Sequence, residues 1–240
     1  MKIKNLKFTL LALCLITSPY VASAGDTDDT YFSVSGMYIT NDTLDVLKVN
    51  TSDTIDDSDY ATLFTIGHNL SPSLAIEGGV MTSAEVRADI SEKIDYDLVG
   101  SPKFHGHSYH AIRSTPGTGD KVIIRATTNP SLLFGLKYTS PESRALTFYG
   151  KAGIMLWGVD YTADTAGGSV FKYASSSNTY NLDARGYRQE FLSATGNDLY
   201  FGFGMSYAIS KKSSIDFDYM SSEIHDSNVS AFSASWVRNF

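Results

Sequence analysis

The chain has 240 residues, of which 26 are acidic and 19 are basic, so its net charge is −7. This balance leaves no basic stripe that could neutralise phosphates, which argues against nucleic-acid binding. Tyrosine, phenylalanine and glycine are abundant and proline is sparse, a composition typical of many short strands.

The first 24 residues have the features of a cleaved signal peptide. A basic start at Lys2, Lys4 and Lys7 precedes the apolar run Phe8–Ile16, and Ala22-Ser-Ala24 fits the A-x-A cleavage pattern. The apolar run is shorter than the roughly 20 residues that a membrane-spanning helix needs. We therefore predict a signal peptide at residues 1–24 and export of residues 25–240.

The exported part is predicted to be acidic and free of disulfides. The only cysteine, Cys14, lies inside the signal peptide, so no disulfide can form after cleavage. The signal peptide also contains three of the 19 basic residues and none of the 26 acidic ones, which leaves a net charge of −10.

Eight segments of the exported part alternate bulky apolar residues with small or polar ones, the period of a β-strand. The clearest case places Leu199, Phe201 and Phe203 on one face, with Gly202 and Gly204 on the other. In chain order the predicted strands are Tyr31–Ile39, Tyr60–Leu70, Leu74–Met81, Thr128–Tyr138, Leu146–Tyr161, Leu199–Tyr207, Ser214–Ser221 and Ala231–Phe240.

The connections alternate between short and long. Short turns follow the even-numbered strands at Ser71-Pro72, Ser140–Ser143 and Ser210–Ser213. Polar loops are predicted after the odd-numbered strands, at residues 41–59, 82–126, 162–197 and 222–230. Alternating pieces inside the second loop, at 90–98 and 122–125, could extend the flanking strands. All turns therefore lie at one end of the sheet and all loops at the other, the pattern of outer-membrane barrels.

The polarity of the alternation separates a membrane barrel from a soluble one. A soluble barrel would place its large apolar residues inside, but here the small and charged residues share one parity and suit a narrow interior. These residues are Ser33, Glu77, Gly79, Lys137, Lys151, Gly202, Gly204, Asp216 and Asp218. We predict an all-β fold, an eight-stranded antiparallel transmembrane β-barrel with short periplasmic turns and long extracellular loops.

Several short segments carry a resemblance to a known family. They are Ile66-Gly-His-Asn-Leu70, Ala75-Ile-Glu-Gly-Gly79, Phe203-Gly204 with Tyr207, and the terminal Phe240. With the signal peptide and the strand pattern, they resemble the bacterial outer-membrane β-barrel family of Gram-negative cells. Its small eight-stranded members include the transmembrane domain of outer-membrane protein A, the Ail/OmpX group and opacity-type proteins. The resemblance implies a place in the outer membrane, with outer-membrane lipid and lipopolysaccharide as partners.

The resemblance also gives the end of the chain a role. In this family the terminal aromatic residue is part of the signal read by the barrel-assembly machinery, which implies that role for Phe240 and Trp236. Arg238 stands where an aromatic or apolar residue is usual. Near the periplasmic interface its long side chain could snorkel towards water.

Five charged residues are predicted to lie in the lumen: Glu77, Lys137, Lys151, Asp216 and Asp218. Buried charges must be paired or hydrated. We favour a structural ion-pair network that plugs the barrel, and the alternative is a narrow ion-conducting pore. A wide, porin-like solute channel is not expected, because eight strands leave little open lumen.

Two loop features invite a metal hypothesis. His105, His107 and His110 lie within six residues and could bind zinc or copper. We favour a solvated or partner-binding loop, and predict no metal and no cofactor. The acidic run Asp53–Asp59 lacks the spacing of a calcium-binding loop, and is interpreted as a solvated loop that could bridge to lipopolysaccharide through divalent cations.

Two functional classes remain from the sequence. The favoured one is a surface-interaction barrel, a surface antigen or adhesin whose loops around His105 and Ser176 contact host or environmental ligands. The alternative is an outer-leaflet enzyme that modifies lipid A, which needs a nucleophile and base near the outer lipid interface. His107-Ser108 lies in a loop and His68 lies near the short-turn end, so we predict that the protein is not an enzyme.

Overall fold

The computed structural model describes residues 30–47, 54–90, 108–113, 121–140, 146–166, 169–174, 179–182 and 188–240. The predicted signal peptide at residues 1–24 lies outside these ranges, and so do His105 and His107. No helix among the described residues is long and apolar enough to cross a membrane.

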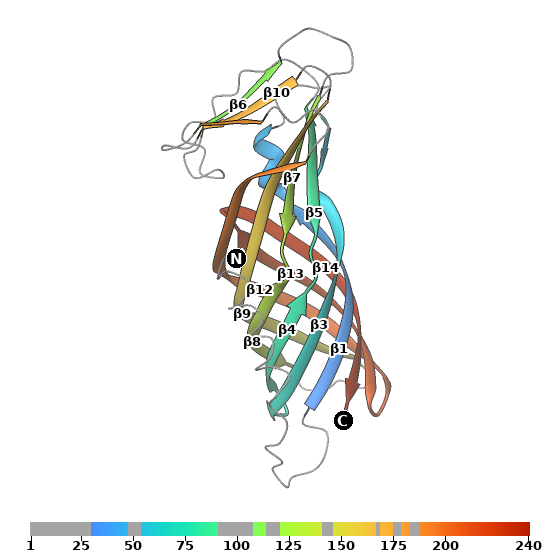
Figure 1. The fold of residues 1–240 in the computed structure, drawn as a ribbon. Helices are drawn as coiled ribbons and strands as arrows, with labels where there is room; N and C mark the ends of the chain where they lie inside the picture. Colours follow the sequence, from blue (N-terminus) through green and yellow to red (C-terminus); the bar gives the residue numbers. More distant parts are fainter. Residues whose placement is uncertain are drawn as a thin grey trace.

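Eight antiparallel strands close into a barrel (Figure 1), as the sequence predicted. They are β1 (Thr30–Asn41), β3 (Ser58–Ser71), β4 (Leu74–Met81), β8 (Ser131–Thr139), β9 (Leu146–Ala166), β12 (Gln189–Ser210), β13 (Ser213–Ile224) and β14 (Ser227–Asn239). The pairing of β9 with β12 closes the sheet into a barrel. The first barrel strand, β1, pairs with the last, β14, and we call this pairing the seam. Within the seam the Ser235 hydroxyl donates to Ser35 Oγ at 2.7 Å.

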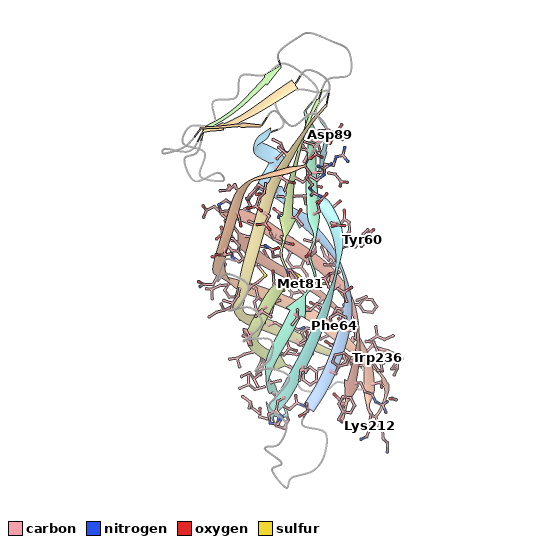
Figure 2. The ribbon with its side chains drawn as sticks, in the orientation of Figure 1. Tyr60, Phe64, Met81, Asp89, Lys212 and Trp236 are labelled. Carbon is pink, nitrogen blue, oxygen red and sulfur yellow. The ribbon has the colours of Figure 1, made fainter. Side chains whose placement is uncertain are left out.

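The outer surface of the barrel is apolar and the inner surface is small and polar. Phe64 and Trp236 project from the outside of the barrel (Figure 2). Ser33, Glu77 and Asp216, which have the opposite parity, are buried inside. This polarity confirms the prediction of a lipid-facing exterior, because a soluble barrel of this size would need its apolar residues inside.

The exposed apolar residues on the outside of the barrel, such as Phe64 and Trp236, form an apolar belt. The strands continue beyond this belt, so the loops predicted at residues 82–126 and 162–197 are wrong in part. β9 pairs with β8 as far as Leu156 and with β7 (Lys121–Thr128) from Val159 onwards. β5 (Glu85–Ile90) pairs with β7 and with β2 (Thr54–Asp56). We use the name extension for β2, β5 and β7 together with the ends of β9 and β12 that lie beyond the apolar belt.

Charges cover the outer face of the extension. Arg125 Nε lies 3.3 Å from Glu85 Oε1, and its Nη1 also pairs with Asp164. Arg188, which immediately precedes β12, also pairs with Glu85. The inward residues of the same strands, such as Val86 and Ile124, are apolar and buried. The extension therefore has a buried apolar interior, continuous with that of the barrel, and a surface suited to water rather than to lipid.

A short 3-10 helix and a tight turn cap the barrel at this end. The helix η1 (Asp42–Leu47) lies in the region predicted as a loop at 41–59 and buries Leu44 completely. The predicted loop at 222–230 is also wrong, because β13 and β14 are joined by a two-residue turn. His225 (φ 54°) and Asp226 (φ 61°) both have positive φ, as a type I′ hairpin requires.

His225 turns inward from that hairpin tip and is buried. Its Nδ1 lies 2.7 Å from the Tyr161 hydroxyl, which in turn lies 3.0 Å from Thr43 Oγ1 of η1. Tyr161 lies above the apolar belt, and burial raises the pKa of its phenol to about 12. These contacts tie the helix, the hairpin tip and β9 together.

A separate three-stranded sheet lies at the far end of the molecule from the short turns (Figure 1). It consists of β6 (Ser108–Arg113), β10 (Ser169–Ala174) and β11 (Thr179–Leu182), with β10 in the middle. β10 also contacts β7 and β9 of the extension. Much of the sequence predicted as loop therefore forms ordered β-structure.

Candidate functional site: the charged lumen

The five charged residues predicted for the lumen all lie on its inner face, on four strands. β4 carries Glu77, β8 carries Lys137, β9 carries Lys151, and β13 carries Asp216 and Asp218. Lys137 and Lys151 are direct neighbours in the β8–β9 register. Like charges opposite each other are destabilising, so this position requires carboxylates nearby.

Two ion pairs supply that compensation. Lys137 Nζ lies 3.2 Å from Asp216 Oδ2, and Lys151 Nζ lies 3.7 Å from Glu77 Oε2. The exposed fractions of the Asp216 and Glu77 side chains are only 4% and 6%. Asp218 makes no salt bridge within the described residues. The group of two lysines and three carboxylates therefore carries an excess of one negative charge.

Hydroxyl groups complete the shells of the carboxylates. Ser206 and Ser214 donate to Asp216 Oδ1 at 2.6 Å and 2.9 Å. Asp218 Oδ2 accepts hydrogen bonds from Tyr149 at 3.1 Å and from Ser233 at 2.9 Å. A buried carboxylate with these donors is satisfied, which makes the cluster a structural element in its own right.

Aromatic rings reach the carboxylates across glycines. Tyr31 donates to Glu77 at 2.5 Å, and Gly67 lies between them in the register of β1, β3 and β4. A Cβ on Gly67 would collide with the Tyr31 ring. Gly204 opens the same route between Tyr149 and Asp218, which lie on strands at either side of it. Sequence reasoning missed both tyrosines, because nothing in the sequence specified these register rows.

The Lys137 ammonium also contacts aromatic rings. It lies 4.1 Å from the centroid of the Tyr149 ring and 5.4 Å from that of Tyr31. Cations are attracted to such faces, more strongly where water is excluded. The ammonium is therefore held by a carboxylate on one side and by tyrosine rings on the others.

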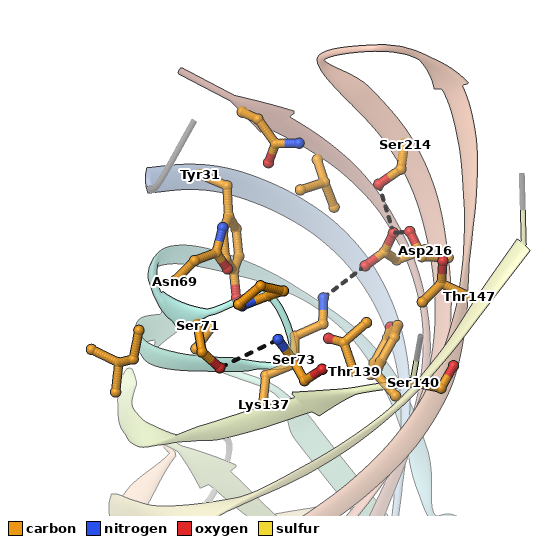
Figure 3. A pocket seen from close by; sticks show the side chains of 17 residues that line it. Tyr31, Asn69, Ser71, Ser73, Lys137, Thr139, Ser140, Thr147, Ser214 and Asp216 are labelled. Carbon is orange, nitrogen blue, oxygen red and sulfur yellow. Dashed lines mark hydrogen bonds and ion pairs between the residues drawn. The ribbon is translucent and has the colours of Figure 1, made fainter. Parts of the chain in front are cut away.

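A cavity of about 660 Å³ lies at the short-turn end of the barrel, next to Lys137 and Asp216 (Figure 3). Its wall includes the β3–β4 turn at Ser71 and Ser73, and the hydroxyl residues Thr139 and Thr147. The lining is mostly polar. The ion pair of Lys137 and Asp216 forms part of its inner wall.

Apolar side chains fill the lumen on the other side of the charge cluster. The buried residues there include Met37, Leu63, Leu133, Met155 and Met220. Between them and the charges remains a void of about 20 Å³, lined in part by Lys151, Tyr200 and Asp218. That space suffices for about one water molecule. The core continues into the extension through Ile124 and Val159.

The structure describes only one of the three histidines that were weak candidates for metal binding. His110 lies in β6, opposite Lys172 in the register, while His105 and His107 lie outside the described residues. No group of three or more possible metal ligands occurs within the described ranges.

At the other end of the barrel, Arg238 donates to Ser213 Oγ at 3.0 Å and the Phe240 amide donates to the Thr30 carbonyl at 3.0 Å.

A closed eight-stranded antiparallel barrel, apolar outside and ionic inside, defines an outer-membrane β-barrel protein. Among solved structures, the chain is similar to Ail of Yersinia pestis, with 12% identity, a TM-score of 0.43, and coverage of 90% of this chain and 100% of Ail. For Neisserial surface protein A the values are 11%, 0.41, 88% and 97%. For the protease OmpT of Escherichia coli they are 9%, 0.39, 92% and 100%.

These likenesses concern the fold alone, since the identities are low. No protein-family model and no curated protein sequence matches the chain. The class of the protein therefore rests on its own strand topology and on the polarity of its two surfaces.

Proposed function

We propose that this protein is a surface-interaction barrel, whose extension and outermost sheet contact ligands outside the cell. The observation that carries the proposal is the continuation of the strands beyond the apolar belt into a folded structure with a buried apolar interior. Val86, Ile124 and Tyr161 are buried there. A barrel that served only as a membrane anchor would need none of this folded material.

The packing of the lumen supports this proposal over conduction. Ions would have to pass the Lys137–Asp216 pair and then a region filled by Met155, Met220 and other apolar side chains. Transfer of a charge into such a region is strongly unfavourable. We expect planar bilayers that contain the purified barrel to show no stable unitary conductance.

The charge of the chain constrains the partner. The exported part carries a net charge of −10, and residues 41–59 alone contain six aspartates and one lysine. A highly sulfated polyanion would be repelled by such a surface. Ail has been crystallised with the heparin analogue sucrose octasulfate. We expect that compound to bind this protein poorly, and propose neutral or basic ligands, with lipopolysaccharide contacted through divalent cations.

The proposal includes the route to the membrane. Export by the signal peptide at residues 1–24 would be followed by insertion through the barrel-assembly machinery. The outward side chain of Trp236 and the terminal Phe240 are the proposed recognition elements. Replacing Phe240 by Ser should lower the fraction of barrel inserted in cells, and should leave refolding of the purified chain in detergent unchanged.

Binding of the intact barrel in lipid nanodiscs to extracellular-matrix proteins, complement regulators and lipopolysaccharide tests the proposal. In one variant, residues 101–118, which include β6, are replaced by a short Gly-Ser linker. The control variant K211S/K212S alters the opposite end of the barrel. Loss of binding in the linker variant alone is the expected result. Equal binding by the linker variant and the wild type would refute the role of this surface.

The enzyme alternative has a direct test. Labelled lipopolysaccharide incubated with the folded barrel should show neither loss nor transfer of acyl chains. Turnover that exceeds the rate with heat-unfolded protein would replace the surface-interaction proposal with a lipid A-modifying activity.

A further inference from the structure

We propose that the cavity at the short-turn end of the barrel is a binding site for a neutral saccharide that enters from the periplasmic side. The site is distinct from the surfaces that would contact ligands outside the cell. Its volume of about 660 Å³ falls within the range of small-molecule pockets, roughly 300–1,000 Å³. The lumen beyond it is filled, so a ligand has access from this end only.

The charged residues of the cavity wall select against ionic ligands. Among the described residues they are Lys137 and Asp216, which pair at 3.2 Å and leave no net charge, so an anion would find the lysine already bound to a carboxylate. A cation would seek Asp216 and the tyrosine rings, but the Lys137 ammonium already occupies that position at 3.2 Å from Asp216. A neutral ligand meets neither obstacle.

The polar atoms of the wall match a polyhydroxylated molecule. Lys137 and Asp216 present a donor and an acceptor 3.2 Å apart, and each sugar hydroxyl can both donate and accept. A vicinal diol could bridge such a pair without breaking it. The Thr139 and Thr147 hydroxyls also line the cavity, and neither makes a side-chain hydrogen bond within the described part of the chain.

The wall also has apolar parts. Pro72, Ala75 and Val237 interrupt the hydroxyl groups around the cavity. The surface of a pyranose ring has the same mixture, because its C–H groups form apolar patches between the hydroxyls. A purely apolar ligand would leave the wall hydroxyls unpaired, which is unfavourable where they are buried.

Nuclear magnetic resonance of the isotope-labelled barrel in nanodiscs tests this site. The probes are maltose and N,N′-diacetylchitobiose, which distinguish a site for plain sugars from one for acetylated amino sugars. Citrate and putrescine serve as the anionic and cationic counterparts. We expect at least one disaccharide to shift the amide signals of Thr139, Thr147 and Ser206 in a saturable manner, with neither charged probe doing so.

Variants locate the binding. Thr147→Trp should fill the cavity and weaken saccharide binding at least tenfold. Ala152→Trp adds the same side chain to the lipid-facing side of β9 and should leave binding unchanged. The double variant T139V/T147V keeps the volume and removes two hydroxyls, and should weaken binding about threefold or more. Heat-modifiable migration on a gel confirms that each variant is folded.

The inference is overturned if neither disaccharide gives saturable shifts with the wild-type barrel. It is also overturned if Thr147→Trp binds as tightly as Ala152→Trp, or if citrate or putrescine competes for the same signals. Loss of ligand binding at the outer surface would bear on the proposed function and would leave this site untouched.

Discussion

Replacing Lys137 by methionine tests whether the charge cluster stabilises the barrel. Methionine keeps most of the volume of the side chain but leaves Asp216 without its cation, in a position where only 4% of the carboxylate side chain is exposed. Breaking one partner out of a buried pair costs about 3–5 kcal/mol. The two serine donors to Asp216 remain and soften the loss, so we expect the free energy of unfolding to fall by about 3 kcal/mol.

The double variant K137M/D216N removes both charges and should recover a large part of that loss. A coupling energy in the range of about 0.5–3 kcal/mol is typical for residues in contact. The single variant Asp216→Asn completes the cycle, and urea unfolding in lipid vesicles, followed by tryptophan fluorescence, measures the stability of all three variants. Lys211→Met at the exposed turn is the control and should change stability by less than about 0.5 kcal/mol. Strict additivity of the two single losses would refute the pairing.

Three further outcomes are expected. Gly204→Ala should lower the free energy of unfolding by about 1–3 kcal/mol, because its Cβ would lie 2.5 Å from the Phe217 carbonyl oxygen and 2.6 Å from the Tyr149 ring; Gly150→Ala, whose Cβ would meet nothing nearer than 3.8 Å, should be almost neutral in the same urea assay. Phe64→Arg on the lipid face should cost about 2–4 kcal/mol in vesicles and much less in a detergent that lets water reach the side chain. The raised pKa of Tyr161 means that its protonated form is favoured in the folded state, so its stabilising contribution is complete below pH 10 and is lost as pH rises towards about 12. The free energy of unfolding of the wild type should therefore fall by roughly 2–3 kcal/mol relative to that of Tyr161→Phe across that interval. Parallel curves of unfolding free energy against pH for the two proteins would exclude the effect.

The membrane strands could be predicted because lipid imposes the same demand on every one of them. Phe201, Phe203 and Met205 repeat at every second residue whatever strand lies beside them, so the period is visible in the sequence alone. The same parity also placed Asp216 and Asp218 in the lumen. Their partners could not be predicted, since Lys137 and Asp216 are 79 residues apart and meet only through the register of the closed sheet.

The extension was harder to predict for a physical reason. Its outer face meets water, so Glu85 and Arg125 stand where lipid-facing strands have aromatic or aliphatic residues, and the apolar contrast is lost. The His225-Asp226 turn was missed because tight hairpins with positive φ are usually marked by Asn-Gly or Asp-Gly. Here the burial of His225 against Tyr161 stabilises a backbone conformation that the local sequence does not predict.

The seam between β1 and β14 has a consequence for the rate at which the barrel forms. Ser35 and Ser235 are 200 residues apart, so the hydrogen bond between them closes most of the chain into one loop. Contacts of such sequence separation place a protein among the slow folders. Until the seam forms, both strands expose unpaired edges that can pair with other chains. The interval before closure is therefore when this protein is most exposed to aggregation, and when an assisting surface would shorten its folding time most.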